Sequence, residues 1–263
     1  QTSIYNALRS SQSSSPYYNK STDAYCYIGT EKPNHDVVIV GWDDSYSKDN
    51  FNTDLEGDGA FICQNSWGDN FGENGFFYIS YYDTNIGTHN VVYTDIENTD
   101  NYDHIYQSDL CGWVGQLGYN KDSIYGANVF TAEGNETLKA ASFYATGKDS
   151  QYELYVVRQF EDETSLEKMI PVASGKLGNA GYYTVDFNQG IEVDAGERYA
   201  VVLYIITPGS VHPMAIEYAA DEATENVDLD DGESYISANG SKWVSVDTVE
   251  KSNLCIKAFS DNR

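Results

Sequence analysis

The chain has 263 residues, of which 41 are acidic and 15 basic, so its formal net charge is -26. This charge argues against nucleic-acid binding and against an anionic membrane surface, because both require a surplus of Lys and Arg. No apolar run approaches the ~18 residues that span a bilayer. The length suits one large domain or two smaller ones, and the wealth of Tyr, Val, Ile and Thr favours β structure.

The first hundred residues are predicted to hold a helix and several strands. Residues 1–10 have the pattern of the end of an amphipathic helix, as if the sequence began inside that helix. The chain also opens without an initiator Met. We therefore expect a processed or truncated product. Strands are predicted at Asp36–Trp42, Ala60–Gln64, Gly75–Tyr81 and Asn90–Tyr93.

The segment Thr94–Asp109 is polar, with few apolar residues, and is predicted to link two domains. A boundary within it gives domains of residues 1–100 and 101–263. Beyond it, short strand patterns recur between turn signals, which predicts an antiparallel sandwich or a jelly-roll-like domain. The continuously apolar run Ala200–Ile206 predicts a central strand buried on both faces. The predicted strands are Ile124–Ala132, Leu138–Thr146, Gln151–Phe160, Gly181–Asn188, Arg198–Thr207, His212–Ala219, Ser234–Gly240 and Leu254–Ser260.

Two short motifs carry the candidate chemistry. His35 stands at the start of a predicted strand in Asn-His-Asp-Val, and Asn65 begins Asn-Ser-Trp-Gly. A thiol peptidase needs an imidazole to take the proton from a cysteine, and a side-chain amide can hold that ring in one tautomer. Trp67 beside the amide would shield the hydrogen bond from water. A lone His near a strand is more often structural, but together the motifs favour a catalytic pair.

These motifs resemble the second half of the papain-like (family C1) cysteine peptidases. The resemblance implies that His35 is the catalytic histidine, that Asn65 orients it and that Trp67 covers the pair. Gly72–Gly75 fits the family's trailing Trp-Gly-Glu-x-Gly pattern, with Phe71 in place of its Trp.

The whole chain is similar to bacterial members of this family that carry a lectin-like domain after the catalytic domain. This implies a mainly β fold: the β-rich lobe of a papain-like α+β peptidase in residues 1–100, followed by an antiparallel, lectin-like β-sandwich over roughly 105–260. It also implies a secreted or cell-surface bacterial enzyme that acts on polypeptides and requires no cofactor. Cell-wall carbohydrate is a further expected partner, through the lectin-like domain.

The nucleophile that the family requires is missing from this chain. Neither a Cys-Gly-Ser-Cys-Trp-like segment nor an oxyanion-hole Gln precedes His35. Cys26 lies too close to His35 in sequence, and Cys63 is expected to pack as a small apolar residue. Cys111 lies in a segment that only superficially resembles the nucleophile's, so we expect it to be buried or to form a disulfide with Cys255.

This absence leaves three explanations open: an enzyme cleaved into two associated chains, a truncated fragment, or a gene product that lost its N-terminal lobe and kept a binding role. In each case the chain alone is expected not to hydrolyse peptides, and the face that meets the missing lobe is expected to be apolar. The competing function is a non-catalytic carbohydrate- or cell-wall-binding or adhesion fragment whose working part is the β-sandwich.

Two further features allow a ligand or a plain structural role. The acidic stretch Asp221–Ser234 could supply oxygen ligands to a structural Ca²⁺, although a solvated loop explains it as well. Trp113, Trp243 and the many tyrosines could stack on sugar rings, although aromatic residues of β domains more often lie in the core.

Overall fold

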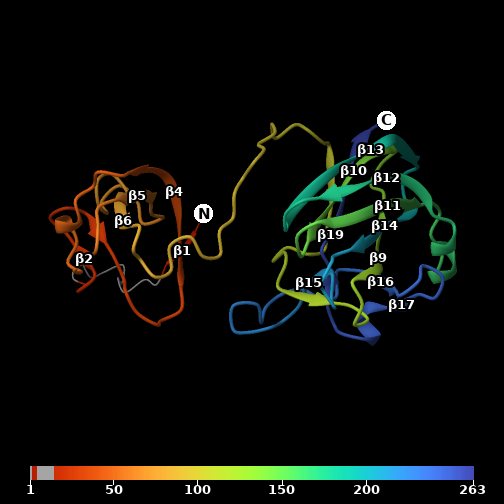
Figure 1. The fold of residues 1–263 in the computed structure, drawn as a ribbon. Coiled ribbons are helices and arrows are strands. Elements are labelled where there is room, and N and C mark those ends of the chain that lie inside the picture. Colours follow the sequence, from red (N-terminus) through yellow and green to blue (C-terminus); the bar gives the residue numbers. More distant parts are fainter. Residues whose placement is uncertain (1, 5–14) are drawn as a thin grey trace. The chain divides into compact units, whose positions relative to one another are not determined.

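The structure is a computed structural model that describes residues 2–4 and 15–263. It divides into two compact units, residues 1–96 and 97–263 (Figure 1). Strands dominate both units, and the helices described are short 3-10 segments at Lys48–Asn50, Glu163–Glu167 and Val246–Thr248. Within the described ranges, no helix is long and apolar enough to cross a membrane.

The first unit is built on a six-stranded sheet in the order β1-β4-β5-β6-β3-β2. Neighbouring strands run antiparallel, except β3 and β6, which are parallel. The pairing of β4 with β5 matches Val38 with Gln64 and so brings the start of β4 and the end of β5 to the same end of the sheet. The bounds are β1 Thr2–Ile4, β2 Tyr18–Asn19, β3 Ala24–Tyr25, β4 His35–Asp43, β5 Ala60–Gln64 and β6 Phe76–Ser80.

Three of the strands predicted here are present: β5 has the predicted bounds, and β4 and β6 differ from theirs by one residue at each end. The predicted helix is wrong where the structure describes it, because Thr2–Ile4 is a strand paired with β4. Hydrogen bonding to the edge of β4 overrides the local helical spacing. The rest of that prediction lies outside the described residues.

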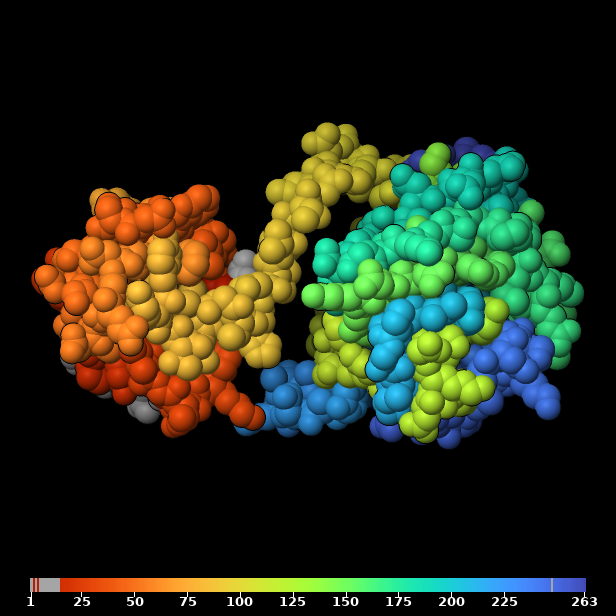
Figure 2. All heavy atoms as spheres, viewed as in Figure 1, coloured from red at the N-terminus to blue at the C-terminus, as the bar shows by residue number. Residues whose placement is uncertain are grey.

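The predicted strand Asn90–Tyr93 is also wrong. The segment has no regular structure, and Val92 and Tyr93 are 76% and 72% exposed. Figure 2 shows this golden-yellow stretch as an uncovered line of atoms. A strand-forming sequence becomes a strand only beside another strand, and none of the described strands pairs with this one.

The strand β4 has two unlike faces. Val37 is buried and packs into an aromatic-rich core with residues of β3 and β6. The alternate residues form an exposed apolar surface, the outer face of β4, made of Val38, Val40 and Trp42, which are 45%, 52% and 68% exposed. Large apolar side chains gathered on one exposed face mark a surface that another part of a protein covers.

The second unit confirms the predicted antiparallel β-sandwich and the mainly β fold. A four-stranded sheet, β13-β10-β19-β7, and a six-stranded sheet, β12-β11-β14-β9-β16-β17, share the main apolar core, to which the three-stranded sheet β18-β15-β8 contributes. Every strand predicted for this unit overlaps an observed one. The bounds are β7 His104–Tyr106, β8 Gly115–Leu117, β9 Ser123–Thr131, β10 Glu136–Ala145, β11 Ser150–Val157, β12 Ile170–Leu177, β13 Gly181–Val193, β14 Arg198–Ile206, β15 Met214–Glu217, β16 Ser234–Ser237, β17 Val244–Ser245, β18 Asn253–Leu254 and β19 Ile256–Asn262.

The strand β14 is the central strand that the apolar run predicts. It lies between β11 and β9. Val201 and Leu203 face the main core, whereas Ala200 and Val202 face a second apolar cluster that includes Phe160 from the segment after β11. Both faces of the strand are therefore buried along most of its length.

The strand β12 was missed because Pro171 and Gly175 interrupt its sequence. It is an edge strand, paired only with β11 in its sheet. Proline is tolerated at an edge, where its missing N–H costs no ladder hydrogen bond.

Candidate active site

His35 and Asn65 meet at one end of the first unit's sheet, where β4 begins and β5 ends. His35 is the first residue of β4, Asn65 directly follows β5, and the antiparallel pairing of these strands brings the two positions together. The Nε2 atom of His35 lies 3.0 Å from Oδ1 of Asn65, which is hydrogen-bonding distance. The two residues picked out in the sequence are thus neighbours in space.

The backbone beside Asn65 fixes which nitrogen of the imidazole carries the proton. The N–H of Ser66 donates to Asn65 Oδ1 at 2.8 Å, so that atom is an acceptor and the orientation of the amide is set. The facing nitrogen of His35 must therefore donate, which puts the proton on Nε2 and leaves Nδ1 as an acceptor. A neutral imidazole with an unprotonated nitrogen is the form that a general base requires.

The loop after Asn65 holds this amide in place. Asn65 is 8% exposed, and its backbone N–H donates to the carbonyl of Gly75 at 2.9 Å. Gly75 in turn donates to the carbonyl of Phe71. Gly72 has a φ of +57°, and a Cβ there would lie 2.1 Å from the carbonyl oxygen of Phe76, so this turn requires glycine.

Trp67 packs against the imidazole. The ring centroids of Trp67 and His35 are 5.3 Å apart, with an angle of 32° between the planes. Phe71 meets Trp67 edge-on at 5.1 Å and Phe77 meets Phe71 edge-on at 5.3 Å, which ties the indole to the core. The sequence marks Phe71 only as a departure from the family pattern, whereas in the structure it supports Trp67.

An open hollow of about 510 Å³ lies beside the imidazole. It is lined by Pro33, Asn34, His35, Asp36 and Ser66. These residues come from the segment that enters β4 and from the residue after Asn65, so the hollow reaches His35.

Residues 105–260 match the family described as a lectin like domain, and residues 3–96 match the family described as papain family cysteine protease. The chain belongs to the lectin-like family over residues 105–260, and it joins this domain to a segment of the papain family of cysteine proteases. Both parts occur in two similar solved structures. One is a Clostridial cysteine protease, Cwp84, after propeptide cleavage, with 27% identity and a TM-score of 0.81. The other is the cysteine protease and lectin-like domains of Cwp84, a surface layer associated protein of Clostridium difficile, with 26% identity and a TM-score of 0.79.

These likenesses cover 100% of this chain but 65% and 58% of the two Cwp84 chains. The chain therefore spans about three fifths of the length of those structures. None of the curated proteins matches it significantly.

The cysteines of the first unit are poor candidates for the papain family's nucleophile. Cys26 and Cys63 are buried free thiols, and burial raises the pKa of each to about 12. Both are therefore protonated at neutral pH, whereas the nucleophile must be a thiolate. Cys63 packs in the apolar core beside β6, as predicted.

The expectation for Cys111 is wrong. Cys111 is exposed, and it forms no disulfide with Cys255, which is buried. The reason is a turn in which Gly112 donates to the carbonyl of Asp109 and brings Cys111 to the surface. Desolvation, and then the Glu217 carboxylate, raise the pKa of the Cys111 thiol.

The acidic stretch Asp221–Ser234 contributes to an unusual arrangement around Asn253. Among the described residues, no group of three or more His, Cys, Asp or Glu side chains is placed to hold a metal. An amide nitrogen has two hydrogens and cannot satisfy four acceptors. Yet Asn253 Nδ2 lies 2.7 to 3.1 Å from four oxygens: the carbonyls of Ser108 and Asp228 and the carboxylates of Glu217 and Asp231.

The two tryptophans considered for sugar stacking differ in setting. Trp113 is 36% exposed and tilts against Tyr144. Trp243 packs against the second apolar cluster, the one that includes Phe160, and meets Tyr125 edge-on. Trp243 therefore supports other aromatic rings.

Proposed function

We propose that this chain supplies the histidine half of a secreted or cell-surface cysteine endopeptidase whose nucleophilic cysteine lies outside the chain. The observation that carries the proposal is the hydrogen bond between His35 and Asn65, because it holds the imidazole with Nδ1 available to a thiol. The match of residues 3–96 to the papain family supports it and indicates a polypeptide substrate.

The residues of this chain would move and hold protons during catalysis. Nδ1 of His35 takes the proton from the cysteine, and the thiolate forms a C–S bond to the peptide carbonyl carbon while the carbonyl electron pair moves to oxygen. As the C–N bond breaks, His35 gives the proton to the leaving amine and a thioester remains. Water then attacks the thioester; His35 takes the proton of the water and returns it to the departing sulfur. Asn65 keeps the ring oriented throughout, and Trp67 limits the access of water.

The outer face of β4 supports the need for a second lobe. Val38, Val40 and Trp42 expose apolar surface on the strand that begins with His35. Covering this surface with the lobe that carries the cysteine would remove it from water, which is favourable. It would also bring that lobe to the strand on which the imidazole stands.

The lectin-like unit is proposed to hold the enzyme at the cell surface by binding carbohydrate of the cell wall. The lectin-like match supports this role, and the description of Cwp84 as surface layer associated supports the location. A non-catalytic adhesion or wall-binding role is the competing function, since the lectin-like match lies wholly within this chain.

The test uses the complete protein from its native source. Intact masses of all polypeptides that purify with this chain, before and after iodoacetamide, identify the partner thiol. We expect one fast-alkylating cysteine, in an associated chain or an upstream segment, and we expect His35→Ala to abolish its fast alkylation and peptide hydrolysis. His212→Ala in the second unit is the control. If no fast thiol is found, or if His35→Ala behaves like the control, the adhesion role replaces the peptidase.

We also propose a structural Ca²⁺ at the oxygens around Asn253. With the amide turned over, Asn253 would add its own oxygen to the four that surround it, and Ca²⁺ prefers such a mixture of carbonyl and carboxylate ligands. Thermal unfolding in Ca²⁺ and in EDTA tests this: Ca²⁺ should raise the Tm of the wild type, and Asp231→Asn should lose most of that rise. An unchanged wild-type Tm would reject the site.

A further inference from the structure

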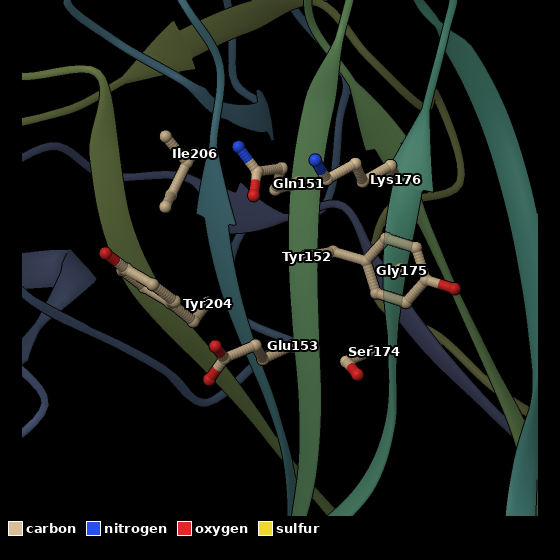
Figure 3. Close-up of a pocket in the computed structure, with 8 residues that line it drawn as sticks. All are labelled: Gln151, Tyr152, Glu153, Ser174, Gly175, Lys176, Tyr204 and Ile206. Atoms are coloured by element: carbon tan, nitrogen blue, oxygen red, sulfur yellow. The ribbon is translucent and has the colours of Figure 1, made fainter.

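The outer side of the six-stranded sheet in the lectin-like unit is hollowed where β12, β11 and β14 run side by side. The hollow has a volume of about 270 Å³, and Figure 3 shows its lining side chains on these three neighbouring strands. Strand register sets its floor, since paired residues of neighbouring strands point to the same face. Two adjacent cross-strand rows contribute side chains, Ser174–Glu153–Tyr204 and Lys176–Gln151–Ile206.

One wall of the hollow is an aromatic ring held in a fixed plane. Tyr204 lines the hollow and is partly exposed. Tyr125, its cross-strand neighbour, stacks on it with centroids 4.2 Å apart and an angle of 21°. Tyr125 is itself met edge-on by Trp243 at 6.2 Å, and it does not line the hollow. The pair behind Tyr204 therefore supports this ring without covering the hollow.

The polar side chains around Tyr204 have unused hydrogen-bonding capacity. Within the described part of the chain, the side chains of Gln151, Ser174 and Lys176 have no hydrogen bond or ion pair with another protein group. Glu153 accepts a hydrogen bond from the hydroxyl of Tyr155 on the same strand. Its carboxylate has room for further donors, since it offers about four acceptor positions. The hollow thus combines strong acceptors, an ammonium donor and an amide that does both.

This combination selects the chemistry of a ligand. A wholly apolar ligand would take Glu153 and Lys176 from water without giving them partners, which is unfavourable. A strongly anionic ligand would meet the Glu153 carboxylate and a chain with a net charge of -26. A pyranose ring satisfies both demands. Its C–H groups are weakly positive and suit the negative face of an aromatic ring, while its hydroxyls donate and accept.

We infer that this hollow binds one ring of a neutral pyranose glycan. The C–H face of the sugar rests on Tyr204, and its hydroxyl groups bond to Gln151, Glu153 and Lys176. The inference rests on the proposed carbohydrate-binding role of the lectin-like unit, and it is independent of catalysis at His35.

The test measures binding of three neutral trisaccharides, built from glucose, from mannose and from N-acetylglucosamine, to the full chain. Calorimetry gives the affinity, and saturation-transfer NMR identifies the sugar protons nearest the aromatic ring. We expect at least one trisaccharide to bind, with the strongest saturation on one C–H face of a ring. Tyr204→Ala should weaken this binding at least about tenfold. Tyr183→Ala, on β13 of the other sheet, is the matched control and should leave it unchanged.

A second variant covers the case in which Tyr204→Ala does not fold. Gln151→Ala removes an exposed side chain and should weaken binding several-fold while the Tm stays unchanged. If both variants bind as the wild type does, the site is wrong and the carbohydrate-binding role survives. If the wild type binds none of the three sugars, both the site and the carbohydrate role fail. If it binds a phosphorylated trisaccharide more tightly than the neutral one, the neutral class is overturned.

Discussion

The hydroxyl of Tyr106 lies 2.7 and 2.8 Å from the two carboxylate oxygens of Glu136, inside the lectin-like unit. Glu136 is 0% exposed and also accepts hydrogen bonds from the hydroxyl of Ser260 and the backbone of Gly134. Strands β7, β10 and β19 are thus joined by one buried carboxylate as well as by their ladders.

Removing the tyrosine hydroxyl should destabilise this unit. Tyr106→Phe takes a donor from Glu136 and an acceptor from the backbone N–H of Glu133. Buried groups left without partners cost about 1–3 kcal/mol, so we expect the free energy of unfolding in urea to fall by that amount. Tyr183→Phe removes a hydroxyl that bonds to an exposed carbonyl, and it should change this free energy by less than about 0.5 kcal/mol. Equal effects of the two substitutions would contradict the prediction.

The same carboxylate predicts a loss of stability in acid. Burial by itself would raise the pKa of Glu136, but the hydrogen bonds from Ser260, Tyr106 and Gly134 outweigh it and hold the pKa below the ordinary 4.5. A carboxyl group with a lowered pKa stabilises the folded state above its unfolded pKa, and this contribution disappears as the pH falls through the folded pKa. The stability difference between wild type and Glu136→Gln should therefore shrink as the pH is lowered below about 4.5. Urea unfolding of both proteins across this range measures it, and a constant difference would refute it.

Removing one partner of the buried ion pair between Lys257 and Asp109 should strongly destabilise the protein. Their Nζ and Oδ1 atoms are 2.7 Å apart, and the side chains are 12% and 0% exposed. Lys257→Met leaves a buried carboxylate without its cation and should lower the free energy of unfolding by about 3–5 kcal/mol. Adding Asp109→Asn should recover part of the loss.

An exposed ion pair provides the comparison. Lys251 and Asp230 also lie 2.7 Å apart, but their side chains are 58% and 83% exposed. Lys251→Met should therefore change the stability by no more than about 1 kcal/mol. The distinction between buried and exposed pairs is wrong if the two lysine variants unfold at the same urea concentration.

Removing the amide of Asn65 should slow turnover in the complete peptidase. Without it the His35 ring loses its fixed tautomer. Proton transfer by a positioned side chain contributes roughly 10²–10⁴-fold, and part of this contribution should be lost. We expect the loss in kcat with little change in KM. Asn65→Asp should restore part of the rate and shift the pH profile to higher pH, because a carboxylate stabilises the imidazolium. Asn188→Ala, on the exposed side of β13, is the control, and a matching rate for Asn65→Ala would remove the orienting role.

The sequence predicts those parts that depend on local pattern. Short apolar runs bounded by polar residues were sufficient for β4 and β5, and the continuously apolar run Ala200–Ile206 was sufficient for β14. Motif spacing singled out His35 and Asn65. Features that depend on distant partners were missed. Thr2–Ile4 is a strand because β4 offers an edge, and Asn90–Tyr93 is not one because no described strand lies beside it.

The hollow beside Tyr204 shows the same limit. Its lining comes from three strands, and nothing in a single strand's sequence gives the register that aligns Ser174, Glu153 and Tyr204. Trp113 and Trp243, which the sequence offered for sugar stacking, do not line it, whereas Tyr204, one of the many tyrosines offered with them, does.

The hydrogen-bond partner of His35, Asn65, is uncharged, and this has a consequence for docking of the lobe that would carry the cysteine. Asn65 offers a dipole and no formal charge, so a protonated His35 finds no counter-ion in its hydrogen-bond partner. In a complete enzyme the compensating charge would be the thiolate of the other lobe, and the attraction between the two would fall as their separation grows. The surroundings of the imidazole would then depend on how closely the two halves dock. The chemical shifts of the His35 ring protons would measure that docking.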